Sequence, residues 1–168
     1  MKTNELPHYD MSVNTTGCCP KFNPEGWDGV ELHFKDKPFV HAETRSAMHV
    51  PLNMNKVFSR VQEHIESSDA FDPSNHIVLT FDPSAWKGEH YFAVSKPVEG
   101  EEMVTLSGDY ITKVFEGEYR EAKNWFGEMQ ELVRTRGKEP GSIYFFYTTC
   151  PKCAKDYGQN YIVGVAET

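Results

Sequence analysis

The feature that most constrains the fold is a repeated order of strand and helix patterns. Residues 38–98 show a strand, an amphipathic helix and two further strands, and residues 108–167 show the same order. The two segments share little sequence, so the repeat concerns structure. It predicts an α+β fold in which two βαββ units form one curved antiparallel sheet. Helices are expected on one face of that sheet and a ligand groove on the other.

The two helices carry the clearest periodic patterns. Asn53 is a suitable N-cap for a helix that ends near Ser67, and its apolar positions recur every four residues: Val57, Val61 and Ile65. The second helix is expected over about residues 118–136, followed by Gly137, a residue type that commonly ends helices. Alternating or apolar runs predict the strands, over residues 39–50, 76–81, 89–98, 109–116, 142–149 and 160–167.

The first 37 residues lack a comparable pattern. Proline and glycine recur through them, but so do large apolar residues that would anchor a loop against a core: Phe22, Trp27, Leu32 and Phe34. We therefore expect residues 1–37 to form an irregular N-terminal lead-in that packs on a domain spanning residues 38–168.

The composition excludes several classes of function. The chain has 168 residues, with 17 Lys and Arg against 25 Asp and Glu, and a formal net charge of −8. Proteins bind phosphate backbones through Lys and Arg, so no nucleic-acid partner is expected. The negative charge also argues against binding to an anionic membrane. No apolar run is long enough for a signal peptide or a membrane span, so we expect a cytoplasmic monomer or homodimer.

One stretch resembles a known family. Residues 108–119 (GDYITKVFEGEY) are similar to the hallmark of the GyrI-like domain, in which a strand leads through a polar residue and Gly to a Tyr that opens a helix. The resemblance covers residues 39–167 in topology and is specific from Gly108 onward. It implies a stand-alone relative of the effector-binding domains of AraC-type and multidrug-responsive regulators, which bind small molecules. Some members hydrolyse reactive cyclopropane-containing natural products, and one subgroup is often labelled hydrolase.

The sequence departs from that family at the penultimate strand. Regulators that bind lipophilic cations carry a buried Glu there, and residues 143–149 (IYFFYTT) contain no acid. Recognition of a cation through that Glu is therefore not expected.

Aromatic side chains are the main candidates for ligand binding. A flat ligand can stack on such rings while a hydroxyl group fixes its orientation, and six of them fall on predicted strands or their connections: Trp86, Tyr91, Tyr110, Tyr144, Tyr147 and Tyr161. Ordinary core packing is the alternative for each.

Two carboxylates are candidates for catalysis. Glu116 ends one predicted strand and Glu43 lies in another, and either would act as a general base toward water if it were partly buried. Glu89 and Glu118 are weaker candidates, and solvated strand ends are the alternative for all four. His41 lies in the same strand as Glu43, where a structural histidine is the commoner case.

The cysteines give the sharpest local pattern. Cys150-Pro-Lys-Cys153 has the spacing of a zinc knuckle or a redox pair, and Cys18 and Cys19 are adjacent near the N-terminus. A structural zinc ion held by these four residues requires the lead-in to fold over the turn after Thr149. A thioredoxin-like pair would instead need a helix directly after Cys150, and residues 154–157 are expected to be too short for one. Inert thiols are the third possibility.

Two functions from different classes remain open on this basis. The first is a binding module that holds a small, largely apolar or aromatic molecule in a groove between its two halves. The second is a hydrolase of a small reactive molecule on the same scaffold, with a Glu that activates water.

Overall fold

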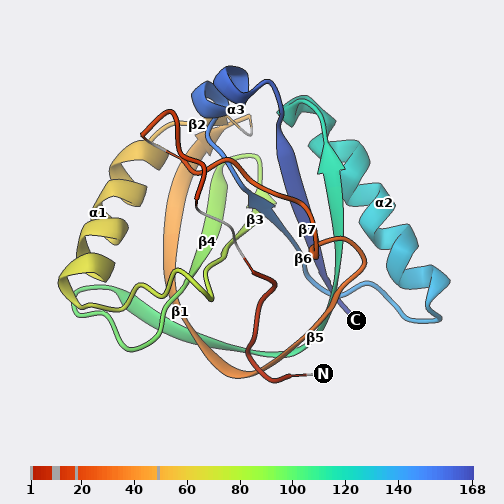
Figure 1. The fold of residues 1–168 in the computed structure, drawn as a ribbon. Helices are drawn as coiled ribbons and strands as arrows, with labels where there is room; N and C mark the ends of the chain where they lie inside the picture. Colours follow the sequence, from red (N-terminus) through yellow and green to blue (C-terminus); the bar gives the residue numbers. More distant parts are fainter. Residues whose placement is uncertain (1, 9–11, 18, 49) are drawn as a thin grey trace.

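Alternating strand sequences dominate the chain, and in the computed structural model they form one antiparallel sheet with two flanking helices (Figure 1). The structure describes residues 2–8, 12–17, 19–48 and 50–168. The elements in chain order are β1 (Glu31–Ala47), β2 (Val50–Pro51), α1 (Met54–Ser67), β3 (Val78–Ser84), β4 (Lys87–Ala93), β5 (Glu102–Glu116), α2 (Ala122–Thr135), β6 (Ile143–Tyr147), α3 (Pro151–Tyr157) and β7 (Tyr161–Glu167). A short 3₁₀ turn, Tyr119–Glu121, precedes α2.

The sheet closes on itself into a six-stranded barrel. Its strand order is β1-β4-β3-β6-β7-β5, and β5 pairs again with β1. Closure depends on the length of β1, whose residues 31–41 pair with β5 while residues 39–45 pair with β4. The sequence predicted a curved antiparallel sheet, which is present, but it did not predict that β5 pairs with β1 and closes the sheet into a barrel. The segments 31–37 and 102–107, treated as lead-in and connection, are strand.

The helices pack against the outer surface of the barrel. Val57, Val61 and Ile65 of α1 pack against outward-facing residues of β1 and β4, such as Val40 and Phe92. The corresponding stripe of α2 covers β5, β6 and β7, and consists of Trp125, Met129 and Val133. Figure 1 shows the two helices on opposite flanks of the sheet. Among the described residues, no helix has the length and apolar character to reach across a bilayer.

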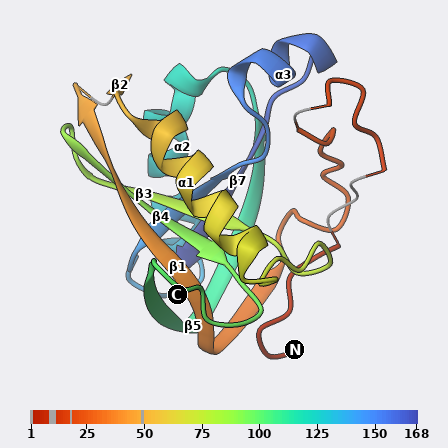
Figure 2. The ribbon, with the colours of Figure 1, turned by 90° about the vertical axis from the view of Figure 1, so that its left-hand side faces the viewer.

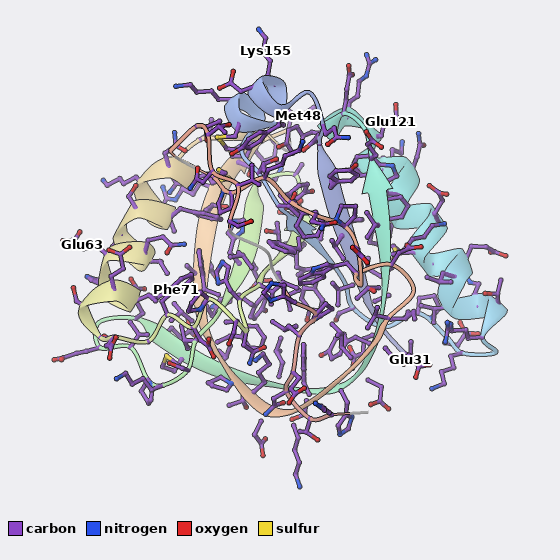
Figure 3. The ribbon with its side chains drawn as sticks, in the orientation of Figure 1. Glu31, Met48, Glu63, Phe71, Glu121 and Lys155 are labelled. Carbon is purple, nitrogen blue, oxygen red and sulfur yellow. The ribbon has the colours of Figure 1, made fainter. Side chains whose placement is uncertain are left out.

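The N-terminal segment covers the inner side of the barrel. Phe22 and Trp27 are buried there and pack against Phe146 of β6, with ring centroids 6.1 and 5.7 Å away. Figures 1 and 2 agree that this segment lies beside the sheet, away from both helices. Side chains fill the interior (Figure 3). The groove expected on this face is thus largely occupied by the chain's own lead-in.

The contact between α2 and β7 predicts a glycine requirement. A Cβ atom at Gly164 would lie 2.5 Å from Sδ and 2.9 Å from Cγ of buried Met129. Gly164→Ala is therefore expected to lower the free energy of unfolding by about 1–3 kcal/mol, because the helix must shift or Met129 must leave its rotamer. Urea unfolding followed by circular dichroism measures this loss.

Gly127 provides the matched control. It lies within α2, and a Cβ atom there would meet nothing within 4 Å. Gly127→Ala is expected to leave stability unchanged or raise it by up to about 1 kcal/mol. Equal effects of the two substitutions would contradict the close packing at Gly164.

Candidate functional site

A histidine on the inner face of β1 lies at the centre of the main polar cluster. At His41, β1 is paired on both sides, with Tyr91 of β4 and Glu102 of β5 directly opposite. The His41 Nε2 lies 2.9 Å from Oε1 of Glu89, and its Nδ1 lies 3.0 Å from Oε2 of Glu102. Both ring nitrogens therefore contact carboxylates.

The two carboxylates control the charge of His41. Burial alone disfavours the imidazolium, and only 10% of this side chain is exposed. The hydrogen bonds to Glu102 and Glu89, together with their negative charges, outweigh that effect and raise the pKa of His41 above its usual value. The protonated ring donates one N–H to each carboxylate. When His41 is protonated, the cluster is thus a cation held between two carboxylates.

Glu43 extends this cluster toward the end of β1. Its carboxylate contacts Nζ of Lys87 at 2.8 Å, and the hydrogen bond to that ammonium group lowers the pKa of Glu43. Each of three residues, His41, Glu43 and Glu89, offers one ligand atom, and these three atoms lie within 4.8 Å of one another. The three residues could therefore also hold a metal ion. Glu43 and Lys87 line an open hollow of about 500 Å³, together with Arg45, Leu52, Asn53 and Trp86.

Three tyrosines continue from His41 across the inner face. The distance between ring centroids is 5.0 Å for His41 and Tyr91, 5.7 Å for Tyr91 and Tyr144, and 6.4 Å for Tyr144 and Tyr110. Burial is the main cause that raises the pKa of Tyr91, to about 12, and it also raises the pKa of Tyr110 and Tyr144. At neutral pH all three are neutral phenols that can donate hydrogen bonds.

A second cluster contains cysteines. The Sγ atoms of Cys19, Cys150 and Cys153 lie within 4.8 Å of one another. Cys18, the fourth predicted metal ligand, lies outside the described residues. A hydrogen bond of 3.3 Å joins Thr16 Oγ1 and Cys153 Sγ. This bond is the main cause that lowers the pKa of Cys153 to about 7. Burial raises this pKa, and hydrogen bonds with Cys150 and Cys19 lower it further.

The segment after Cys150 is helical, contrary to expectation. Cys150 is the N-cap of α3, whose first residue is Pro151, and Gly158 ends the helix in the left-handed conformation with φ of 72°. Residues 154–157 alone are too short for a helix, but α3 begins at Pro151, because proline suits the first turn of a helix. Cys150 and Cys153 therefore lie at the start of a helix that follows a strand, the setting that the sequence did not predict.

A family model described as "Bacterial hydrolase" matches residues 9–168. The chain belongs to this family. A structure of an uncharacterized conserved protein from Listeria innocua is similar, with a TM-score of 0.58 and 11% identity over 82% of this chain and 91% of that chain. At that identity the likeness concerns the fold alone. A search of curated proteins found no match. None of these comparisons identifies the GyrI-like family.

The predicted aromatic residues fall in separate places. Tyr91, Tyr110 and Tyr144 lie together on the inner face. Tyr161 lies beside Phe22, under the N-terminal segment. Tyr147 faces outward near Tyr119, and Trp86 is 61% exposed at the turn between β3 and β4. The structure therefore does not assemble the six into one groove.

The carboxylates are also separated. Glu116 is exposed at the end of β5, whereas Glu43 lies beside His41 and Glu89. Glu102 was missed by the sequence analysis, and Glu89 was considered only a weak candidate. Alternation places His41 and Glu43 on one face of β1, but the partners on β4 and β5 depend on strand register, for which the sequence gives no signal.

Proposed function

We propose that the protein is a hydrolase whose active site is the cluster of His41, Glu89, Glu102 and Glu43. The observation that carries this proposal is that both ring nitrogens of a largely buried histidine contact carboxylates, and that Glu43 of the same cluster lines an open hollow. Membership of a family described as "Bacterial hydrolase" supports it.

Glu89 is the best candidate for the general base. Its side chain is more buried than those of Glu43 and Glu102, and His41 fixes its orientation. In the proposed reaction Glu89 takes a proton from water, whose oxygen forms a bond to the electrophilic carbon. The bond to the leaving group breaks, and the proton passes from Glu89 to that group. His41 positions Glu89, and the Tyr91 phenol is suited to donate a hydrogen bond to the developing negative charge.

The surroundings indicate the class of substrate. Trp86 and Leu52 offer exposed apolar surface in the hollow, where Arg45 and Lys87 accompany the carboxylate of Glu43. A small molecule with an aromatic or aliphatic group and a hydrolysable bond fits these features, and the net charge of −8 of the whole chain disfavours a strongly anionic one.

A non-catalytic binding function is the second candidate. The row of Tyr91, Tyr144 and Tyr110 from three different strands favours it, because a flat ligand could replace part of the N-terminal segment against these rings. This alternative corresponds to the GyrI-like resemblance, with two βαββ units around a ligand.

Incubation with a panel of esters, lactones, amides, epoxides and strained-ring compounds in H₂¹⁸O separates the two functions. Mass spectrometry is expected to detect a product that contains one added water with ¹⁸O. A compound recovered intact and bound, with no such product from any panel member, would favour the binding function.

A further inference from the structure

The cysteine cluster joins two segments that are far apart in the sequence. Cys19 lies in the N-terminal segment, and Cys150 and Cys153 lie at the start of α3. In a tetrahedral zinc site each sulfur lies about 2.3 Å from the ion, so neighbouring sulfurs are about 3.8 Å apart. Mutual separations within 4.8 Å need little adjustment to reach that geometry. We propose that Cys19, Cys150 and Cys153 bind one zinc ion, which fastens the N-terminal segment to the barrel.

The number of converging sulfurs favours a shared ion over a disulfide. A disulfide joins two sulfur atoms at about 2.05 Å and has no use for a third. Here three sulfurs approach one another, and Cys153 is buried, with 1% of its surface exposed. Metal binding releases the thiol protons, and the charge of the ion compensates the resulting thiolates in this buried place. Zinc is the common divalent ion that selects thiolate ligands, and Cys150 and Cys153 have the spacing of a zinc knuckle.

Hydrogen bonds outside the sulfurs hold the two segments in position. Tyr157 of α3 donates its hydroxyl proton to the carbonyl oxygen of Cys19 at 2.6 Å. Tyr119 donates to the carbonyl oxygen of Thr149 at 2.7 Å, next to Cys150. Thr16 contacts the sulfur of Cys153. Such contacts around a metal site orient its ligands and account for part of its affinity. Zinc takes four ligands, and a water molecule would complete the set.

Metal analysis of the full-length protein tests the proposal. Protein purified under reducing conditions from zinc-supplemented cells is expected to contain about one zinc ion per chain. Cys150→Ser and Cys153→Ser are expected to lower the zinc content at least about tenfold. Lys152→Ala is the matched control, because this exposed residue lies between the two cysteines and offers no thiol; its zinc content is expected to stay unchanged.

Two measurements on the unmodified protein remain decisive if a serine variant fails to fold. Removal of zinc with a chelator is expected to expose three or four thiols to a colorimetric thiol reagent, and to speed tryptic cleavage after exposed Lys21. Folded, reduced protein with less than about a tenth of a zinc ion per chain would overturn the proposal. So would two or fewer newly reactive thiols on zinc removal, or a Cys150–Cys153 disulfide under reducing conditions.

Discussion

Replacing Glu89 by Gln is expected to lower the rate of hydrolysis by about 10²- to 10⁴-fold, the usual contribution of a general base. The amide cannot take a proton from water, but it has the size of the carboxylate and can still accept a hydrogen bond from His41. The fold should therefore persist. The initial rate with the best panel substrate measures the effect, and circular dichroism verifies the fold.

Other glutamates supply controls for this prediction. Glu63→Gln changes an exposed side chain that points away from the barrel on α1 (Figure 3), and should leave the rate unchanged. Glu116→Gln tests one of the two main bases predicted from the sequence, Glu116 and Glu43, and is also expected to have no effect. A loss of activity in Glu116→Gln, with full activity in Glu89→Gln, would contradict the assignment of the base.

The pH dependence offers a further check of the same site. In its protonated form, the ring of His41 positions Glu89. The two carboxylates raise the pKa of His41. Activity that depends on this charge falls as pH rises through the raised pKa of His41, that is, above its ordinary value of 6.5. His41→Gln should abolish this alkaline limb as well as most of the rate.

The type and position of most elements could be predicted from the sequence, because each follows from a local pattern. The stripe of Val57, Val61 and Ile65 indicates α1, and it is buried in the structure. The ends of the long strands could not be predicted in the same way. Pro38 and Gly108 were interpreted as boundaries, yet β1 and β5 run through them, next to a bulge between Phe34 and Lys37.

The candidate site depends more on tertiary structure than the elements do. Glu89 and Glu102 reach His41 only because β4 and β5 pair with β1 in one particular register. A shift by one residue would turn these side chains to the other face. The cysteine cluster was easier to anticipate, since the spacing of Cys150 and Cys153 is a local signal. The position of Cys19 beside them depends on how the N-terminal segment packs.

The largest expected effect on stability is a fall in the free energy of unfolding as the pH is lowered. His90 is fully buried on the outer face of β4, where its ring nitrogens contact the hydroxyl groups of Thr44 at 2.9 Å and Thr80 at 3.0 Å. Burial, with a smaller effect from the charge of His41, lowers the pKa of His90 to about 4. The neutral ring has one donor and one acceptor, which two hydroxyl groups can satisfy.

The direction of this pH effect follows from the pKa of His90 in the folded and unfolded chains. Between pH 6.5 and about 4 the unfolded chain binds a proton at this histidine and the folded chain does not. Acidification over this window is therefore expected to lower the free energy of unfolding by up to about 3 kcal/mol from His90 alone. Urea unfolding at a series of pH values measures the slope. His90→Gln, which cannot be protonated, should flatten it, whereas exposed His8→Gln should not.

His41 does not cancel this slope. Because its pKa is raised in the folded state, its stabilising contribution is fully present below 6.5 and disappears only as pH rises through the raised value. His76 adds to the acid sensitivity, since burial lowers its pKa to about 4 as well. The His90→Gln protein should therefore keep part of the slope of unfolding free energy against pH. The double variant with His76→Gln and His90→Gln should lose most of this slope. An unchanged slope in the double variant would mean that the acid sensitivity arises from the carboxylates.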